Sequence, residues 1–208
     1  MCREVLTART SKGQMPLHVA IACGQKGCAE AILNAARKVN AGVDVGLEVT
    51  DRKGNNALHL AERTSPELVD WLVAVYGARF HAMIRKQNAK GKNPINIAVV
   101  RAEDAAILPK FLRPLATMLA DLRAVLEQSV GRDALRPMHQ AVARGHLDFI
   151  RQLAAAHSDT LNALDGRART PIFYARDKAV RRSCYLFIQL LISIVRVYST
   201  CANTITLT

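Results

Sequence analysis

The chain has 208 residues, half of them apolar and only 5% aromatic, a profile that favours packed helices over a β-sandwich. Its formal net charge of +12 and pI near 10.0 make acidic proteins, nucleic acid and anionic lipid the candidate partners. There is no long run of Lys and Arg, and basic residues do not alternate with aromatic ones, which argues against nucleic acid as the partner.

The cysteines and the N-terminus indicate a reducing compartment. The five cysteines are Cys2, Cys23, Cys28, Cys184 and Cys201. Their odd number and irregular spacing do not match a small disulfide-bonded domain, and we expect Cys23 and Cys28 to be small buried side chains. Residues 1–9 contain no apolar stretch long enough for a secretory signal. A cytoplasmic location is therefore expected, with membrane association as the alternative.

A short signature recurs along the chain, in which a Pro, or Ala57 in its place, is followed four residues later by an Ala. The copies begin at Pro16, Ala57, Pro94, Pro137 and Pro171, at intervals of 41, 37, 43 and 34 residues. Pro suits the first position of a helix because its φ is fixed and its missing N–H would have no partner there. The small Ala lets successive helices approach closely. The signature therefore predicts the start of a short helix in each of five units.

A second helix is predicted in each unit by apolar residues spaced one turn apart. These segments are Ala31-Ile32-Leu33, Leu68-Val69 with Leu72-Val73, Ile107-Leu108 with Phe111-Leu112, Phe149-Ile150 with Leu153, and Leu186-Phe187 with Leu190-Leu191. Gly24 and Gly145 are expected to end the first helix of their units with positive φ. A helix pair of this size cannot bury its apolar side alone, so the units are expected to stack.

The period and the start signature resemble the ankyrin repeat, whose unit is a β-turn followed by two helices opened by Thr-Pro-Leu-His. The resemblance implies an all-α, ankyrin-like repeat solenoid of stacked helix-turn-helix units with short β-turn fingers, over residues 1–195. The units are expected near residues 7–40, 48–80, 86–130, 132–157 and 162–195, with a C-terminal tail at 196–208. The Asp- and Gly-containing segments 50–54, 87–91 and 162–166 are expected to form exposed fingers.

The copies depart from the family pattern at several positions. The family Thr is kept only at Thr170, and the other units carry Met15, Asn56, Asn93 and Arg136. The family His is replaced by Asn96 and Phe173, and the Gly before the signature by Ala134 and Ala168. The array is therefore degenerate.

Two segments add length beyond the repeats, residues 34–50 and residues 109–131. In the second segment, apolar residues from Leu115 to Leu126 recur at intervals of three and four, which predicts an amphipathic helix of about five turns. We interpret it as an elongated second helix or an added helix on the convex side, started or kinked by Pro114.

The apolar segment 184–195 is the least ordinary part of the chain. Its uncharged run of about 12 residues is shorter than the roughly 20 needed to span a bilayer, so a final second helix is the simpler interpretation. A terminal repeat normally turns a polar face outward, whereas this helix would be apolar on nearly all sides. A membrane surface, a dimer partner or further protein would each cover it.

The residues that could carry catalysis, chiefly the histidines, are better explained by structural roles. The family resemblance implies that His18, His59 and His139, which share one position of the signature, hydrogen-bond the backbone of adjacent turns. The other three histidines have no Cys or carboxylate at metal-ligand spacing, and the chain lacks a Gly-rich phosphate loop and a nucleophile elbow. No catalytic, metal-binding or cofactor-binding residue is expected, and the chain is not expected to be an enzyme.

The resemblance also implies that finger tips and first helices line a concave, partner-binding face. Eight basic residues fall on that face: Lys12, Lys53, Lys90 and Arg167 at the tips, and Arg63, Arg101, Arg144 and Lys178 near the ends of the first helices. They predict a basic stripe that binds another, acidic protein. The alternative is a solvated surface balanced locally by Asp51, Glu62 and Asp177. We expect a non-catalytic protein–protein interaction module or adaptor; the alternative is a membrane-associated ankyrin protein that docks to lipid through residues 184–195.

Overall fold

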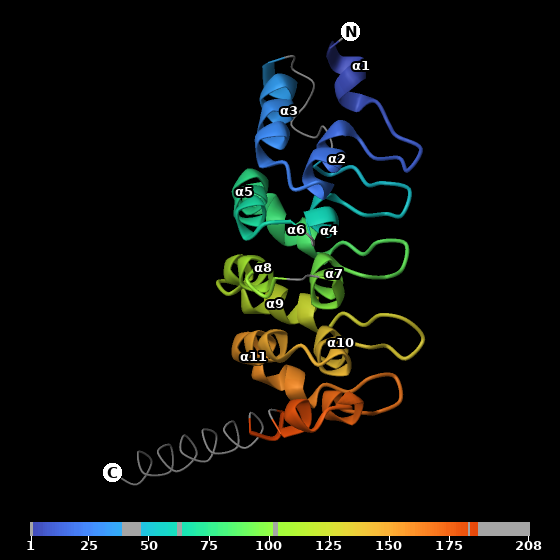
Figure 1. The fold of residues 1–208 in the computed structure, drawn as a ribbon, viewed down its shortest axis with the longest axis vertical. Helices are drawn as coiled ribbons and strands as arrows, with labels where there is room; N and C mark the ends of the chain where they lie inside the picture. The colour runs from blue at the N-terminus through green and yellow to red at the C-terminus, as the bar shows by residue number, and fades with distance from the viewer. Residues whose placement is uncertain (1, 39–46, 62–63, 102–103, 183, 187–208) are drawn as a thin grey trace, which may run out of the picture.

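The computed structural model describes residues 2–38, 47–61, 64–101, 104–182 and 184–186 of the chain (Figure 1). Its helices, in chain order, are α1 (Cys2–Thr7), α2 (Pro16–Ala22), α3 (Lys26–Lys38), α4 (Ala57–Leu60), α5 (Pro66–Tyr76), η2 (Gly77–Arg79), α6 (Phe80–Arg85), α7 (Pro94–Arg101), α8 (Ile107–Leu115), α9 (Leu119–Leu126), α10 (Pro137–Arg144), α11 (Leu147–Ala156), η3 (Ser158–Asn162) and η4 (Pro171–Tyr174). Over these residues the chain is mostly helical and forms no strand, so the predicted all-α class is confirmed.

The helices lie in successive tiers along the long axis of the molecule, and loops project from one side of every tier (Figure 1). The first helices α2, α4, α7 and α10, followed by η4, contact one another in this order and form an inner row. The helices α5, α8 and α11 form a second row behind it, also in contact from one tier to the next. The units therefore pack side by side in the order in which they occur in the sequence.

Small side chains allow the inner row to pack closely. Ala20, Ala61, Ala98, Ala141 and Ala175 are all buried, at most 7% exposed, and they belong to one continuous apolar core. A larger side chain at any of these positions would separate two tiers, because the core is close-packed and cannot absorb the added volume.

Asparagine precedes two inner helices and does more than cap them. The Asn56 side chain accepts the amide of the third helical residue and donates from Nδ2 to the Met83 carbonyl oxygen at 2.9 Å. Asn93 accepts in the same way and donates to the Val125 carbonyl oxygen at 3.0 Å. Both amides are fully buried, so each joins the beginning of a unit to its own end.

The segment 109–131 was predicted to contain a helix of about five turns, either an elongated second helix or an added one. The single long helix is wrong, whereas a separate, shorter added helix is present. The chain forms α8, which ends just after Pro114, and then the separate helix α9. The two helices bury different faces, α8 against α5 and α7 and α9 against α6 of the preceding unit. The break at Ala116–Met118 lets the apolar residues of both helices reach the core. The second unit has a matching third helix, α6, which was not predicted from the sequence.

The last unit differs from the others in the described residues. Its inner helix is only the 3-10 turn η4, whose few backbone hydrogen bonds are supplemented by side-chain contacts. The Arg169 guanidinium lies over the Phe173 and Tyr174 rings, at 5.1 and 4.9 Å from their centroids. Burial opposes ionisation of Asp165, but hydrogen bonds from Tyr174 Oη and from Arg169 outweigh it and hold the pKa of this carboxyl well below its usual range.

The five projecting loops share one backbone conformation, and we call them fingers 1 to 5. In each, a β-turn hydrogen bond is donated by a residue with positive φ, as in a type I turn followed by a left-handed residue. These residues are Gly13 (73°), Gly54 (73°), Gly91 (69°), Ala134 (48°) and Ala168 (56°). Finger 5 is centred on residues 165–168, slightly later than expected. Ala at the last two positions is strained, because its Cβ disfavours this conformation.

Adjacent fingers are linked through the backbone. Arg52 N donates to the Lys12 carbonyl oxygen at 3.0 Å, and Ala89 N donates to the Lys53 carbonyl oxygen at 2.9 Å. Position 54 requires glycine, because the Cβ of any other residue would lie 2.9 Å from Ala89 N and clash with it. Fingers 1, 2 and 3 therefore form a continuous edge along one side of the stack.

The prediction that Cys23 and Cys28 are buried was wrong, because both are exposed. They lie at the end of α2 and the start of α3, where the chain turns at the surface. None of the helices within the described residues is long and apolar enough to cross a membrane. Most of segment 184–195, and the tail 196–208, fall outside the described residues.

Candidate functional site

Three buried histidines, on α2, α4 and α10, each connect their own inner helix to the backbone at the finger of the next unit, as the resemblance implied. The Nδ1 atoms of His18, His59 and His139 accept backbone amides at the start of their own helices. Their Nε2 atoms lie 2.9–3.0 Å from the carbonyl oxygens of Val49, Lys92 and Arg169. Burial lowers the pKa of His59 to about 4 and also lowers that of His139. Both imidazoles are therefore neutral and structural at pH 7.

The third unit, which lacks this His, is connected differently. Gln140, from the following inner helix, donates from Nε2 to Asn96 Oδ1 at 3.0 Å, and the same atom lies 3.5 Å from the Leu135 carbonyl oxygen. A side chain from the next unit thus replaces the missing imidazole. No phosphate, metal or substrate role is needed to explain these buried polar groups.

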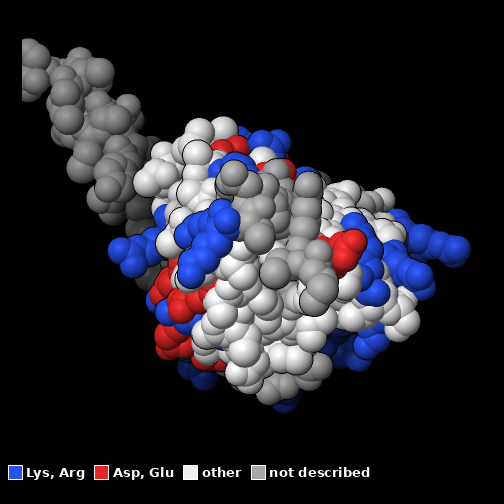
Figure 2. Space-filling view, turned by 90° about the horizontal axis from the view of Figure 1, so that it is seen from above, with Lys and Arg blue, Asp and Glu red and all other residues white. Residues whose placement is uncertain are grey.

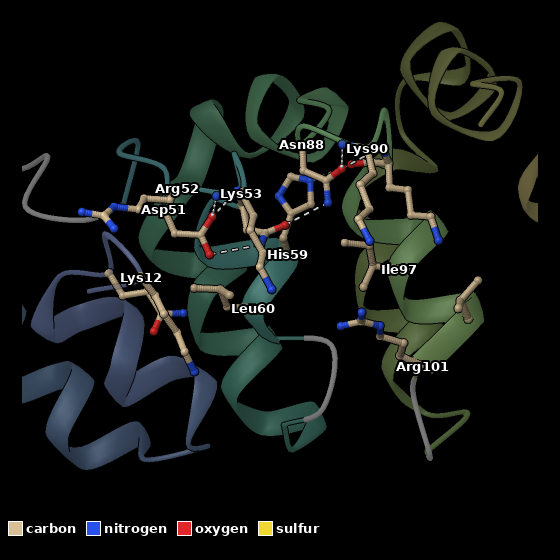
Figure 3. Close-up of a pocket in the computed structure, with 14 residues that line it drawn as sticks. Lys12, Asp51, Arg52, Lys53, His59, Leu60, Asn88, Lys90, Ile97 and Arg101 are labelled. Atoms are coloured by element: carbon tan, nitrogen blue, oxygen red, sulfur yellow. Dashed lines mark hydrogen bonds between the residues drawn. The ribbon is translucent and has the colours of Figure 1, made fainter. Parts of the chain in front are cut away.

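The candidate site is an open groove of about 410 Å³ between fingers 1 to 3 and the inner helices α4 and α7 (Figure 3). We call it the basic groove. Its cations are Lys12, Arg52, Lys53, Lys90, Lys92 and Arg101, and its apolar floor is Leu60, Ile97 and Val100. Lys53 and Lys90 descend into the groove from their fingers, whereas Arg52 extends away from them (Figure 3). Arg101 enters from the end of α7.

The charge of the groove is strongly one-sided. Among the lining residues that the structure describes, six are cationic and only Asp51 is acidic. The Asp51 carboxylate accepts the amides of Lys53 and Asn55, each at 2.8 Å, and the Asn55 side chain at 3.1 Å, so it stabilises the finger. Viewed down the stack, Lys and Arg side chains lie on the side from which the fingers project and also on the opposite side, where more Asp and Glu side chains lie among them (Figure 2).

Four lining cations have no ion pair with another described residue. Within the part of the chain that the structure describes, no carboxylate lies within 4.0 Å of the charged nitrogens of Lys12, Arg52, Lys53 or Lys90. All four side chains are exposed. Unpaired like charges repel one another, and an anion bound between them would relieve that repulsion.

The structure brings together four of the eight predicted residues, Lys12, Lys53, Lys90 and Arg101. Arg144 lines a neighbouring pocket that Arg101 also borders. Lys178 lies apart, near Arg181 and Arg182 at the C-terminal end of the described chain.

The remaining two predicted residues, Arg167 and Arg63, are not placed in either the basic groove or these pockets. Arg167 is paired with Asp133 of finger 4, with 2.9 Å between Nη2 and Oδ1, so its first role is to link two fingers. Arg63 lies outside the described residues.

Sequence reasoning missed Arg52 and Lys92, although the signal was present. Both lie inside a finger, one before and one after the predicted tip residues Lys53 and Lys90. If the fingers are aligned by their turn residues, Arg52 and Lys92 can be identified as finger cations. Aligning the units by the helix signature does not reveal them.

The residues that the structure describes contain no group of three or more His, Cys, Asp or Glu side chains placed to hold a metal ion. The chemistry of the basic groove is that of cations and hydrogen-bond donors, which suits recognition of an anionic ligand. No protein-family model matches the chain and no curated protein shows a significant match, so its function must be inferred from the groove and the repeated units.

Proposed function

We propose that the chain is an ankyrin-type repeat array. Support comes from the inner row and second row of helices, the five fingers with their left-handed residue, and the histidines that connect each inner helix to the next finger. The inner helix and the finger recur once per unit, and the connecting histidine recurs in three of the five units, which is typical of a solenoid whose units contact only their neighbours.

The array acts as a non-catalytic protein-interaction module whose basic groove binds an acidic segment of a partner protein. The observation that carries this proposal is a set of exposed cations from three successive units around one apolar-floored groove, four of which have no ion pair with any residue that the structure describes. A partner with carboxylates over the cations and small apolar side chains over Leu60 and Ile97 would satisfy both parts of this surface.

Binding of a fluorescein-labelled decaglutamate peptide to the full chain tests this function. We expect Lys53→Glu with Lys90→Glu to reduce affinity at least about tenfold, because each exposed ion pair contributes roughly two- to fivefold and the reversal adds repulsion. Arg113→Glu is the control, an exposed charge reversal on α8 away from the groove that changes the net charge half as much as the double variant. A loss of binding free energy in Arg113→Glu half as large as in the double variant would mean that the peptide responds only to net charge. Tighter binding of a single-stranded DNA oligomer of equal charge would point to a nucleic-acid partner instead.

A second candidate function is contact with an anionic membrane surface through the C-terminal end. Tyr185 and Leu186 are 56% and 57% exposed beside the cations Arg181 and Arg182. An apolar pair next to basic residues is suited to the headgroup region of acidic lipid. Co-sedimentation with phosphatidylserine vesicles, lost in Tyr185→Glu with Leu186→Glu and retained in Lys53→Glu, would support this role.

A further inference from the structure

We infer that the basic groove selects an extended acidic peptide with one carboxylate in every third residue, in a polyproline-type conformation. This inference rests on the proposed function and specifies its ligand. It follows from the position of one cation in each of fingers 1, 2 and 3, which border the groove, and from the distance between these fingers.

Fingers 1, 2, 3 and 5 carry a cation at one equivalent position, where finger 4 carries Asp133. The amides of Lys53, Lys90 and Arg167 each donate, at 2.8–2.9 Å, to the side-chain oxygen of the residue two positions earlier. Lys12 is likewise the third residue of finger 1, whose first residue, Thr10, accepts the finger's β-turn bond from Gly13. Lys12, Lys53 and Lys90 therefore form a row with one cation per tier.

Backbone hydrogen bonds set the spacing of that row. Each finger is a pair of chain segments, joined within finger 2 by Asp51 N donating to the Asn55 carbonyl oxygen at 3.0 Å. The next finger continues this pattern through the bond between Ala89 N and the Lys53 carbonyl oxygen at 2.9 Å. Chain segments paired in this way lie about 4.8 Å apart, so equivalent cations recur at about 9.6 Å.

A polyproline helix has the same repeat. It has three residues per turn and rises about 3.1 Å per residue, so every third side chain returns to the same side after about 9.3 Å. A β-strand would place every third side chain on the opposite face. The mismatch between about 9.3 and 9.6 Å stays below 1 Å over the three tiers of the groove.

The size of the groove also favours a single extended chain. An α-helix presents equivalent side chains every seven residues, about 10.5 Å apart, but it is about 10–12 Å wide. The groove has a volume of about 410 Å³. That volume accommodates a few side chains of an extended segment above Leu60 and Ile97, and small residues such as Pro or Ala between the acids would contact this floor.

Three synthetic peptides test the spacing with the full chain. The first is a labelled pentamer of Glu-Pro-Ala, and the second has the same composition with its five Glu contiguous. The third is an Ala-rich helical peptide with Glu at every seventh position. At low salt, where surface charges are weakly screened, we expect the Glu-Pro-Ala peptide to bind about tenfold tighter than its isomer. Lys53→Glu should reduce this preference to about threefold or less, since it breaks the middle of the row, and Arg113→Glu should leave it unchanged.

The possible failures are distinguishable. Equal binding of the two isomers, with both weakened by Lys53→Glu, would overturn the spacing rule and leave the acidic-partner function standing. Binding of either isomer that is insensitive to Lys53→Glu would overturn the groove as the site and with it the proposed function. Preference for the helical peptide would overturn the extended conformation.

Discussion

Ala168→Gly should stabilise the protein, although glycine is usually destabilising. Ala168 has a φ of 56° at the finger position where Gly13, Gly54 and Gly91 occur. A left-handed conformation destabilises a non-glycine residue by roughly 1–2 kcal/mol, and Gly removes this strain. The greater freedom of Gly in the unfolded chain offsets about 0.5–1 kcal/mol of the stabilisation. Ala168 is exposed, so its methyl group contributes little packing. The expected net gain is about 0.5–1 kcal/mol.

Urea denaturation followed by circular dichroism measures this gain. With an m value of about 2 kcal/mol/M, the midpoint should rise by roughly 0.3–0.5 M. Ala35→Gly, at an exposed helical position of α3, is the matched control and should destabilise by about 1 kcal/mol. Ala134→Gly should act in the same direction as Ala168→Gly, because its φ is 48°. A midpoint that falls in Ala168→Gly as it does in Ala35→Gly would refute the strain argument.

Three further predictions concern the connections between units. The pKa of folded His59 is about 4 and its unfolded value is 6.5, so the unfolded chain binds the proton more readily. The free energy of unfolding should therefore be constant above about pH 6.5 and fall by about 2 kcal/mol by pH 5. Urea midpoints measured across this range check the prediction, and a His59→Asn variant should lose this acid-dependent part of the change. Gly54→Ala should cost at least about 1 kcal/mol more than Gly91→Ala, because both have positive φ but only the first would press a Cβ against Ala89 N; equal losses of unfolding free energy would contradict this. Asn93→Ala should cost about 2–3 kcal/mol, since it removes a helix cap and leaves buried partners unsatisfied, and an unchanged urea midpoint would contradict it.

Much of the local architecture could be predicted from the sequence because its signals are local. Pro at the first helical position and Ala four residues later set the start and the packing distance of the inner helices, whatever the rest of the chain does. The finger turns follow from the small, polar residues that precede each signature. The position of the buried histidines follows from the same period.

The third helices could not be predicted in this way. The apolar residues of α6 and α9 are spaced as in any amphipathic helix, and their separation from α5 and α8 is decided by contacts between the two helices across neighbouring units. The hydrogen bond from Gln140 to Asn96, which connects the third and fourth units without an imidazole, could not be predicted either. It joins side chains 44 positions apart in the sequence.

By itself, the sequence determined that the chain is helical, repeated and basic, and where each unit begins. Only the tertiary structure decided which cations meet: stacking brought Lys12, Lys53, Lys90 and Arg101 into one groove with Arg52 and Lys92, while it placed Arg167 against Asp133. The physical reason is that helix starts and turns depend on residues a few positions apart, whereas the charge of a surface depends on side chains brought together from different units by packing.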